Sequence, residues 1–450
     1  MWVERIISTL ILTYLHLLMI VTKKKKQRPQ VDEEDGVTEY EKLVEEALIP
    51  DVCQETSQIH AVEVRETYHR GNGDNILKGE PDKVTFNPGW SPGSLTLIWR
   101  MAEMMEAKGV QRSLRNYRCL VPCKAQAAGI CYGLNGNNLP PPSAVVGLLR
   151  WKNIRKVRLF EPNRDVLQAL GNSGIEVNLA VPNSQLQNIA NNPSAAGSWV
   201  ATNIQAYPAV TFGSITVGNE LIPGPQAQLV LPAMQNIYNS IQGAGLGGRI
   251  KVSTVVSTAV TTGFPPSAGV FTPQAMPFMV PIAQFLARTG APLMITVYPY
   301  FAYVQNDVVS LDYALFRANY DVVSDGALRY RNLFDAMVDT VYSAIEKVDG
   351  LGRRAHIPII ITESGWPSRG RSGGGWRNAK TYDATVSDAW TYNQNLVNHA
   401  ARGTPKRPGT PLVTYVFGLF NENLKPGAEI ERNFGIFYPN MQPVYDINFP

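Results

Sequence analysis

The sequence predicts an α/β fold, a single (β/α)8 barrel preceded by a poorly ordered N-terminal extension. From residue 129 onward, eight apolar strand-like runs alternate with helix-like stretches over roughly 320 residues, the repeat expected of such a barrel. A doubly wound open sheet is the alternative. Such a sheet usually has a glycine-rich phosphate turn after its first strand, and Gly133-Leu134-Asn135-Gly136 lacks the full spacing. We therefore divide the chain into an extension, 1–128, and a main domain, 129–450.

Each predicted strand is a short run rich in apolar and β-branched residues, as in a parallel sheet buried on both faces. Ile359-Ile360-Ile361-Thr362 is the clearest of these runs. The predicted strands are 129–134, 156–160, 176–181, 214–218, 250–256, 293–298, 357–362 and 412–419.

The stretches between the strands favour helices, and we expect Ser143 to cap the first of them because a serine side chain accepts from free backbone N–H groups. The clearest predicted helices are 143–150, 228–242, 279–289, 331–347 and 385–401.

The composition is that of an ordinary globular protein. The chain has 450 residues, of which 44% are hydrophobic and 17% are charged, and its net charge is only +4. With no long basic stripe in the main domain, we expect no nucleic-acid partner. The four cysteines are Cys53, Cys119, Cys123 and Cys131, and no second Cys or His pair lies near the Cys119–Cys123 spacing. We therefore predict no zinc site, no other metal and no cofactor.

The extension differs in pattern from the main domain. An apolar segment at 6–21 spans sixteen residues, short of the roughly 20 that a spanning helix needs, and Lys23–Lys26 follow it. The next hundred or so residues are polar and aperiodic, which predicts disorder. Ala125-Gln126-Ala127-Ala128 resembles a signal cleavage site, but no apolar core stands directly before it. We favour an altered N-terminus joined to an intact domain; a membrane tether through 6–21 is the alternative.

Two predicted strands end in a glutamate. Glu220 follows Ile215-Thr216-Val217-Gly218-Asn219, and Glu363 follows the isoleucine run. In a barrel both carboxylates would stand at the C-terminal face, where barrel enzymes keep their chemistry. A carboxylate pair predicts glycoside hydrolysis; a retaining enzyme needs one ionised nucleophile and one protonated acid about 5–5.5 Å apart.

Other strand-end residues could support that pair. Asn219 could donate to a sugar hydroxyl, and Glu422 and Lys425 after the last strand could pair and bring positive charge toward the nucleophile. Among the aromatic residues at the same rim, we assign Tyr298, Tyr300 and Trp366 to a sugar-binding groove and leave the rest to core packing: Phe301, Tyr303, Phe417 and Phe420. No Gly-x-Ser-x-Gly turn occurs, which argues against a serine hydrolase.

An ordered series of motifs resembles the plant β-1,3-glucanases of glycoside hydrolase family 17. The matching stretches are Gly129-Ile130-Cys131-Tyr132-Gly133, Asn137-Asn138-Leu139-Pro140, Thr216-Val217-Gly218-Asn219-Glu220, Val297-Tyr298-Pro299-Tyr300, Asn332-Leu333-Phe334-Asp335, Glu363-Ser364-Gly365-Trp366-Pro367, Gly403-Thr404-Pro405-Lys406-Arg407-Pro408-Gly409 and Phe434-Gly435-Ile436-Phe437.

The resemblance implies that 129–450 is a glycoside hydrolase catalytic domain, a retaining endo-hydrolase of β-1,3-glucan such as callose, laminarin or fungal wall glucan. It implies that Glu363 is the nucleophile and Glu220 the acid/base. It also implies that Asn219, Glu422 and Lys425 support this catalytic pair. We expect a monomer with a role in plant defence, located outside the cell or in the cell wall.

One departure from the family stands in the second predicted strand. Phe160 occupies a position where the family commonly has tyrosine, and the lost hydroxyl would weaken activity if it bonds substrate or the nucleophile. Three alternatives to a β-1,3-glucanase stay open. One is a β-1,3-1,4-glucanase, which the same carboxylate pair would serve. Another is a β-glucan-binding protein without catalysis, an interpretation that the complete carboxylate set disfavours. The third is a wholly structural or allergen-like role, which the sequence does not exclude.

Overall fold

The computed structural model describes residues 126–351, 357–372 and 380–450. The predictions for the extension concern residues outside these ranges: the apolar segment 6–21, the disorder that follows it, and Cys53, Cys119 and Cys123. None of the helices in the described ranges combines the length and the apolar character that a membrane span needs.

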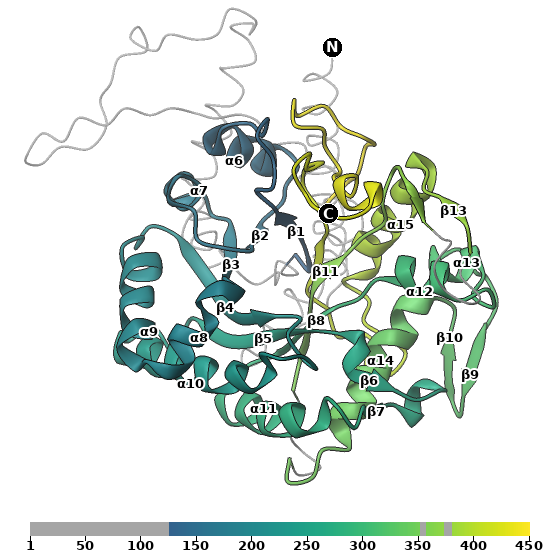
Figure 1. Ribbon diagram of the computed structural model, residues 1–450. Coiled ribbons are helices and arrows are strands. Elements are labelled where there is room, and N and C mark those ends of the chain that lie inside the picture. Colours follow the sequence, from purple (N-terminus) through teal and green to yellow (C-terminus); the bar gives the residue numbers. More distant parts are fainter. Residues whose placement is uncertain (1–125, 352–356, 373–379) are drawn as a thin grey trace, which may run out of the picture. The chain divides into compact units, whose positions relative to one another are not determined.

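Eight parallel strands close into a barrel, in the neighbour order β1-β14-β11-β8-β5-β4-β3-β2 (Figure 1). Closure is made between the first and last strands, where Ile130 of β1 pairs with Val416 of β14. The prediction of a (β/α)8 barrel is confirmed, and the open-sheet alternative is wrong because the sheet has no free edge. The barrel strands are β1 (Ala128–Tyr132), β2 (Lys156–Leu159), β3 (Glu176–Val181), β4 (Thr211–Asn219), β5 (Lys251–Ser257), β8 (Leu293–Thr296), β11 (Ile359–Ser364) and β14 (Thr414–Val416).

The strands are buried on both faces, as their apolar runs predict. β1 and β14 are buried at every position, and β3 and β11 at all but one. Each fully buried Val, Leu or Ile contributes about 1.5–3 kcal/mol relative to an exposed one, so these strands provide much of the driving force for closure.

Helices cover the outside of the barrel. Their bounds are α6 (Pro142–Trp151), α7 (Arg164–Leu170), α8 (Leu186–Asn191), α9 (Pro193–Val200), α10 (Ala227–Gly243), α11 (Met276–Thr289), α14 (Leu333–Glu346) and α15 (Val386–His399). Single-turn helices also occur: η3 (Asn183–Gln185), η4 (Ala201–Gln205), η5 (Thr258–Val260), η6 (Pro266–Ala268) and η7 (Glu429–Arg432).

Local signals explain where the helices begin. Asn332 accepts from the N–H of Asp335 and caps α14, and Thr385 accepts from the N–H of Asp388 and caps α15. The predicted cap at Ser143 is wrong. The chain enters α6 earlier, with Pro141 at the cap and Pro142 in the first turn, because the fixed φ of proline suits that position.

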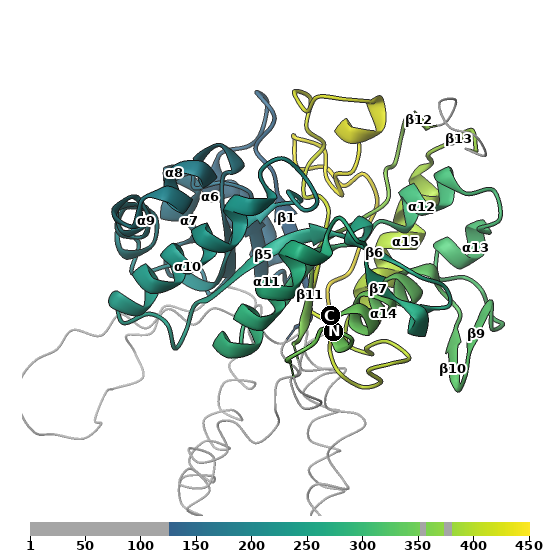
Figure 2. The same cartoon turned by 60° about the horizontal axis from the view of Figure 1, so that its bottom comes forward.

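Several longer excursions leave the barrel after its strands and were not predicted. They are β6 (Thr261–Thr262) with β7 (Val270–Phe271), α12 (Pro299–Gln305), α13 (Leu311–Ala314), β9 (Val323–Asp325) with β10 (Leu328–Tyr330), and β12 (Arg371–Ser372) with β13 (Tyr382–Asp383). Figure 2 shows α8, α9 and α10 on one flank of the barrel and α12, α13 and the β9–β10 hairpin on the opposite flank.

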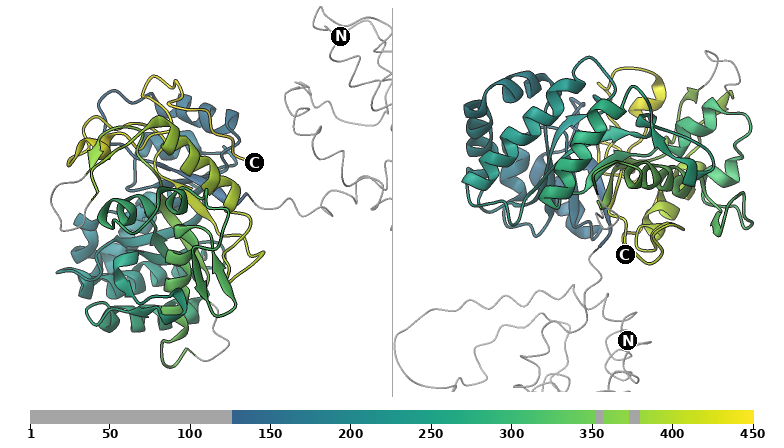
Figure 3. Two further views of the ribbon diagram at one scale, coloured as in Figure 1. Left: turned by 90° about the vertical axis from the view of Figure 1, so that its right-hand side faces the viewer. Right: turned by 90° about the horizontal axis from the view of Figure 1, so that it is seen from below.

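The first and last described residues lie side by side. The side chain of Gln126 donates to the carbonyl oxygen of Pro450 at 3.0 Å and to that of Asn153 at 2.8 Å, and it accepts from the N–H of Arg155. Figure 3 shows the C-terminus beside the start of β1 in both views. This contact lies at the N-terminal end of the barrel strands, whereas the strand-end glutamates project from the other end.

Candidate active site

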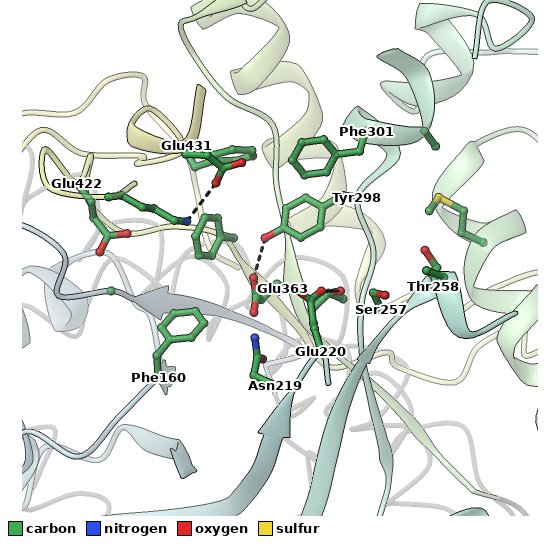
Figure 4. A pocket seen from close by; sticks show the side chains of 18 of the residues that line it. Phe160, Asn219, Glu220, Ser257, Thr258, Tyr298, Phe301, Glu363, Glu422 and Glu431 are labelled. Atoms are coloured by element: carbon green, nitrogen blue, oxygen red, sulfur yellow. Dashed lines mark hydrogen bonds and ion pairs between the residues drawn. The ribbon is translucent and has the colours of Figure 1, made fainter. Parts of the chain in front are cut away.

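A cavity of about 760 Å³ lies over the C-terminal ends of the barrel strands. Its lining comes from the ends of β4, β5, β8 and β11, from the loops that follow β1, β2 and β14, and from α12 and α14. The carboxylates of Glu220 and Glu363 face this space together (Figure 4). Of the predicted site residues, the cavity brings together Phe160, Asn219, Glu220, Tyr298, Glu363, Glu422 and Lys425.

Glu363 is held by ionic and polar contacts and is only 7% exposed. Its Oε1 accepts from Nη1 of Arg158 at 2.5 Å, and its Oε2 accepts from the Tyr298 hydroxyl at 2.9 Å. Burial, followed by the charge of Glu363, raises the pKa of Tyr298 well above its usual range, so this hydroxyl keeps its proton and acts as a donor. Both carboxylate oxygens are thus fixed in direction by charge-assisted bonds.

Arg158 is the most important residue that the sequence analysis missed. It is 0% exposed, it lies in β2, and its Nη2 donates to Oδ1 of Asn219 at 2.6 Å. Burial alone would lower the pKa of the guanidinium, but the charge of Glu363 and its hydrogen bond, together with Cys131 and Tyr298, outweigh burial and the pKa is raised. A signal was available, because this arginine stands between Val157 and Leu159 in a predicted barrel strand and a buried charge requires a partner.

Glu220 has a different setting. It directly follows β4 with a φ of +56°, and it is exposed to the cavity. A non-glycine residue in this conformation is strained, and such strain clusters at functional sites. The Thr296 hydroxyl donates to its Oε1, a contact that the sequence analysis also missed. Partial burial, and then the negative charge of Glu363, raise the pKa of Glu220, which favours the protonated form.

Glu422 and Lys425 border the cavity but do not form the predicted side-chain pair. Glu422 accepts from the backbone N–H of Asn135 at 2.7 Å, and burial raises its pKa. Lys425 instead pairs with Glu431 at 3.5 Å, and its ammonium lies 4.0 Å from the centre of the Phe417 ring. Glu422 and Lys425 share a backbone turn, but their side chains bond different partners, which spacing in the sequence could not reveal.

The Glu422 carboxylate packs closely against the backbone at Gly133. A Cβ at Gly133, the residue directly after β1, would stand 2.4 Å from an oxygen of Glu422, so only glycine fits at that position.

The aromatic assignments are corrected in part. Tyr298 lines the cavity, but Tyr300 and Trp366 are 0% exposed and lie outside its lining. The loop after β11 folds Trp366 back into the core, where its ring meets Tyr300 at 5.1 Å and its N–H donates to Tyr382. The apolar wall of the cavity is made instead by rings that were left to packing or given no role in the site, Phe301, Phe417 and Phe434, together with Phe160.

Phe160 stands beside the charged centre. The guanidinium carbon of Arg158 lies 4.6 Å from the centre of its ring, and the ring meets Phe417 edge to face at 6.0 Å. The ring therefore covers one side of the buried arginine and presents an apolar surface to the cavity.

Within the described ranges, no three His, Cys, Asp or Glu side chains are grouped so that they could hold a metal ion. Cys131 is a buried free thiol whose Sγ donates to the carbonyl oxygen of Thr362, and burial raises its pKa far above the usual range. It is a structural thiol in the barrel wall rather than a reactive one.

A (β/α)8 barrel that presents two carboxylates of unlike environment at its C-terminal face defines a glycoside hydrolase. The chain belongs to glycosyl hydrolases family 17, whose family description matches residues 128–449.

The sequence and structural relatives agree with this family. The chain is 48% identical over 330 residues to the acidic isoform of glucan endo-1,3-beta-glucosidase of Zea mays, covering 73% of this chain and 93% of that protein. It is equally 48% identical to Lichenase-2 of Hordeum vulgare, covering 73% of this chain and 100% of the other. Among solved structures, CJP38, a beta-1,3-glucanase and allergen of Cryptomeria japonica pollen, matches with a TM-score of 0.67 and 45% identity over 72% of this chain and 99% of that chain.

Proposed function

We infer that the protein is a retaining endo-hydrolase of β-1,3-glucosidic linkages in glucans such as callose, laminarin and fungal wall glucan. The observation that carries this conclusion is the pair of unlike carboxylates on one cavity wall. Glu363 is ion-paired with a buried guanidinium, whereas Glu220 has a strained backbone and makes no ion pair with any described residue, and partial burial and the charge of Glu363 raise its pKa.

The proposed reaction has two steps. In the first, Glu363 attacks the anomeric carbon while Glu220 gives its proton to the glycosidic oxygen; the carbon–oxygen bond breaks and a glycosyl ester forms on Glu363. In the second, water attacks the same carbon, its proton passes to Glu220, and Glu363 leaves as a carboxylate. Formation of the ester removes the negative charge that helps to raise the pKa of Glu220, so the pKa falls when this residue must act as a base.

In this proposal the remaining residues support the pair. Asn219, held by Arg158, faces the reacting sugar, and Lys425 and Glu422 border the space that a neighbouring sugar would occupy. The phenyl rings of Phe160, Phe301, Phe417 and Phe434 offer apolar surfaces for sugar faces.

Reducing-end release from laminarin by the full-length protein tests the function. We expect Glu363→Gln to lower turnover by at least about 10³-fold, since the loss of a covalent nucleophile removes most of the rate. Glu346→Gln is the matched control, because Glu346 lies on the barrel exterior and pairs with Arg407 and Lys406. A folded wild-type protein that binds laminarin but releases no ends would favour the binding protein without catalysis, and Phe160→Tyr would then be the next variant.

A β-1,3-1,4-glucanase is the second candidate, because the barley lichenase is as similar to this chain as the maize β-1,3-glucanase. Comparing kcat/KM on laminarin with that on mixed-linkage β-glucan decides between them. Faster cleavage of the mixed-linkage polymer would reverse the assignment.

We also propose that residues 129–450 form the whole catalytic domain and act as a monomer outside the cell or in the cell wall. All residues that line the cavity come from this one stretch of chain, which supports a site that needs no second copy. Light scattering of the purified protein tests the monomeric state, and a fluorescent fusion in plant cells tests the location. A stable dimer, or retention at a membrane, would contradict them.

A further inference from the structure

The backbone turn that carries Glu220 is unusual at both ends. Gly218 has a φ of +81° and Glu220 a φ of +56°, with Asn219 between them. The direction of the Glu220 side chain therefore depends on a turn that a free chain rarely adopts. Something outside β4 must hold this turn in place.

The side chain of Asn183 holds it. Oδ1 of Asn183 accepts from the backbone N–H of Asn219 at 2.9 Å, and Nδ2 donates to the backbone carbonyl of the same residue at 3.0 Å. One bond holds the peptide unit before the Cα of Asn219 and the other holds the peptide unit after it, so together they fix the backbone on both sides of this residue.

The register of the barrel explains why a side chain does this. β3 ends at Val181, which is paired with Val217 of β4, and continuing that register would place residue 183 opposite Asn219. The chain instead turns at Pro182 into η3. The carboxamide of Asn183 thus stands in for the peptide group of the strand that has ended, and it extends the β-ladder by one step.

Asn183 acts on the backbone and not on the substrate. It is not part of the cavity lining, and the side chain of Asn219 is separately held by Arg158. The other restraints on the turn are the bond from the Glu220 N–H to Val255 and that from the Thr254 hydroxyl to Gly218. Asn183 differs from these restraints because it bonds both the N–H and the C=O of Asn219, the residue directly before Glu220.

We propose that Asn183 is a positioning residue for the proton donor, which sets the direction of Glu220 toward the glycosidic oxygen. The proposal rests on the inferred function, in which Glu220 protonates the leaving oxygen. In kcat/KM, which reports the first step of the reaction, a misdirected acid slows only the bond cleavages that need this proton. A sugar leaving group needs it, whereas a dinitrophenolate departs without it.

The test compares kcat/KM for laminarin with kcat/KM for 2,4-dinitrophenyl β-laminaribioside, using full-length variants. For Asn183→Ala we expect a loss of about 10²-fold on laminarin, the cost of a catalytic group displaced by about 1 Å, and less than about 3-fold on the aryl substrate. Asn236→Ala is the matched control. Its carboxamide likewise makes two bonds to the backbone, here to the carbonyls of Ile189 and Ala190, which lie outside the cavity lining, and we expect equal effects on both substrates.

A second variant keeps the test decisive if Asn183→Ala folds poorly. Asn183→Asp preserves the shape and the acceptor but loses the donor. Its added negative charge favours the protonated form of Glu220, so a selective loss on laminarin would come from geometry and not from loss of the proton. Equal losses on both substrates, or a similar selective loss in Asn236→Ala, would overturn the proposal.

Glu220→Ala separates this inference from the function beneath it. If Glu220→Ala shows the selective loss on laminarin and the Asn183 variants do not, the positioning role alone is wrong. If Glu220→Ala shows no selective loss, the assignment of the acid is wrong as well. Within the Glu220→Ala background, adding Asn183→Ala should change neither substrate further.

Discussion

Glu220 and Glu363 look alike in the sequence and differ in the folded barrel. Each follows an apolar strand, and each is followed by turn residues. In the structure Glu363 is 7% exposed, ion-paired and bonded at both oxygens. Glu220 opens onto the cavity, has a positive φ, and receives one side-chain bond, from Thr296.

The difference shows that position in the barrel sets where chemistry occurs, while neighbouring side chains set which chemistry each carboxyl performs. Contacts on the Glu363 side should matter for every substrate, because the nucleophile acts in every turnover. Contacts on the Glu220 side should matter only where a proton is transferred.

Arg158→Met should give the largest effect. It leaves a buried carboxylate without its charge partner, which typically costs about 3–5 kcal/mol, or at least about 10²-fold in rate if it falls on the reacting state. We expect this loss on laminarin and on an activated aryl laminaribioside alike. Arg158→Lys keeps the positive charge but lacks the two separate N–H donors of the guanidinium, and it should lose less activity. A loss confined to laminarin would mean that Arg158 supports the proton donor Glu220 and not the nucleophile Glu363.

Tyr298→Phe removes one bond to Glu363 and should have the next largest effect. A hydrogen bond to a charged group is worth about 1.5–3 kcal/mol, so kcat/KM should fall about 10- to 10²-fold on both substrates. Tyr445→Phe is the control, since it removes a buried hydroxyl that bonds Asn393, outside the cavity. If the two variants lose equally, the effect is one of general stability.

Thr296→Val should change the pH dependence of kcat/KM more than its maximum value. The Thr296 hydroxyl donates to Glu220 and stabilises its ionised form, so removing the hydroxyl should raise the pKa of Glu220 further. Because the acid must be protonated, the alkaline limb of kcat/KM against pH should move to higher pH. Thr414→Val, in β14, is a control that should leave the limb in place. A shift to lower pH would contradict the assignment.

Asp339→Asn should leave catalysis unchanged and alter stability. This carboxyl of α14 is 0% exposed, and burial raises its pKa from 3.8 to about 6. The folded state therefore favours the protonated form, and its contribution to stability is present below about pH 4 and lost as the pH rises through about 6.

An asparagine stays neutral, so relative to wild type the variant should gain up to about 3 kcal/mol of unfolding free energy between pH 4 and pH 7. Urea unfolding at the two pH values measures this difference, with the exposed Asp349→Asn as control. Parallel pH dependence in wild type and Asp339→Asn would contradict the prediction.

Much of the barrel was predictable because its strands are buried on both faces and read as unbroken apolar runs. All eight predicted strands overlap an observed one, although the last was expected at 412–419 and is only Thr414–Val416. The hairpins β6–β7, β9–β10 and β12–β13 were missed. Their strands have only two or three residues, which is too short for an alternation of apolar and polar residues to be recognised.

The site was predictable where position along a strand decides it and not where tertiary contacts do. Both strand-end glutamates reach the cavity because parallel strands bring their ends together. Tyr300 and Trp366 also follow strand ends, yet their loops turn inward, and no local pattern distinguishes a ring in a groove from a ring in a core. Asn183 was missed because its partner, Asn219, is set by the register between two strands.

The contact between Gln126 and Pro450 has a consequence for how the chain can be cut and rejoined. Because the two ends of the barrel touch each other at the face opposite the cavity, a short linker could join them without crossing the cleft. New ends could then be opened at Gly326, in the exposed turn between β9 and β10. We expect such a circular permutant to fold and to keep the geometry of both carboxylates, since the order in which the strands are synthesised is not what closes the barrel.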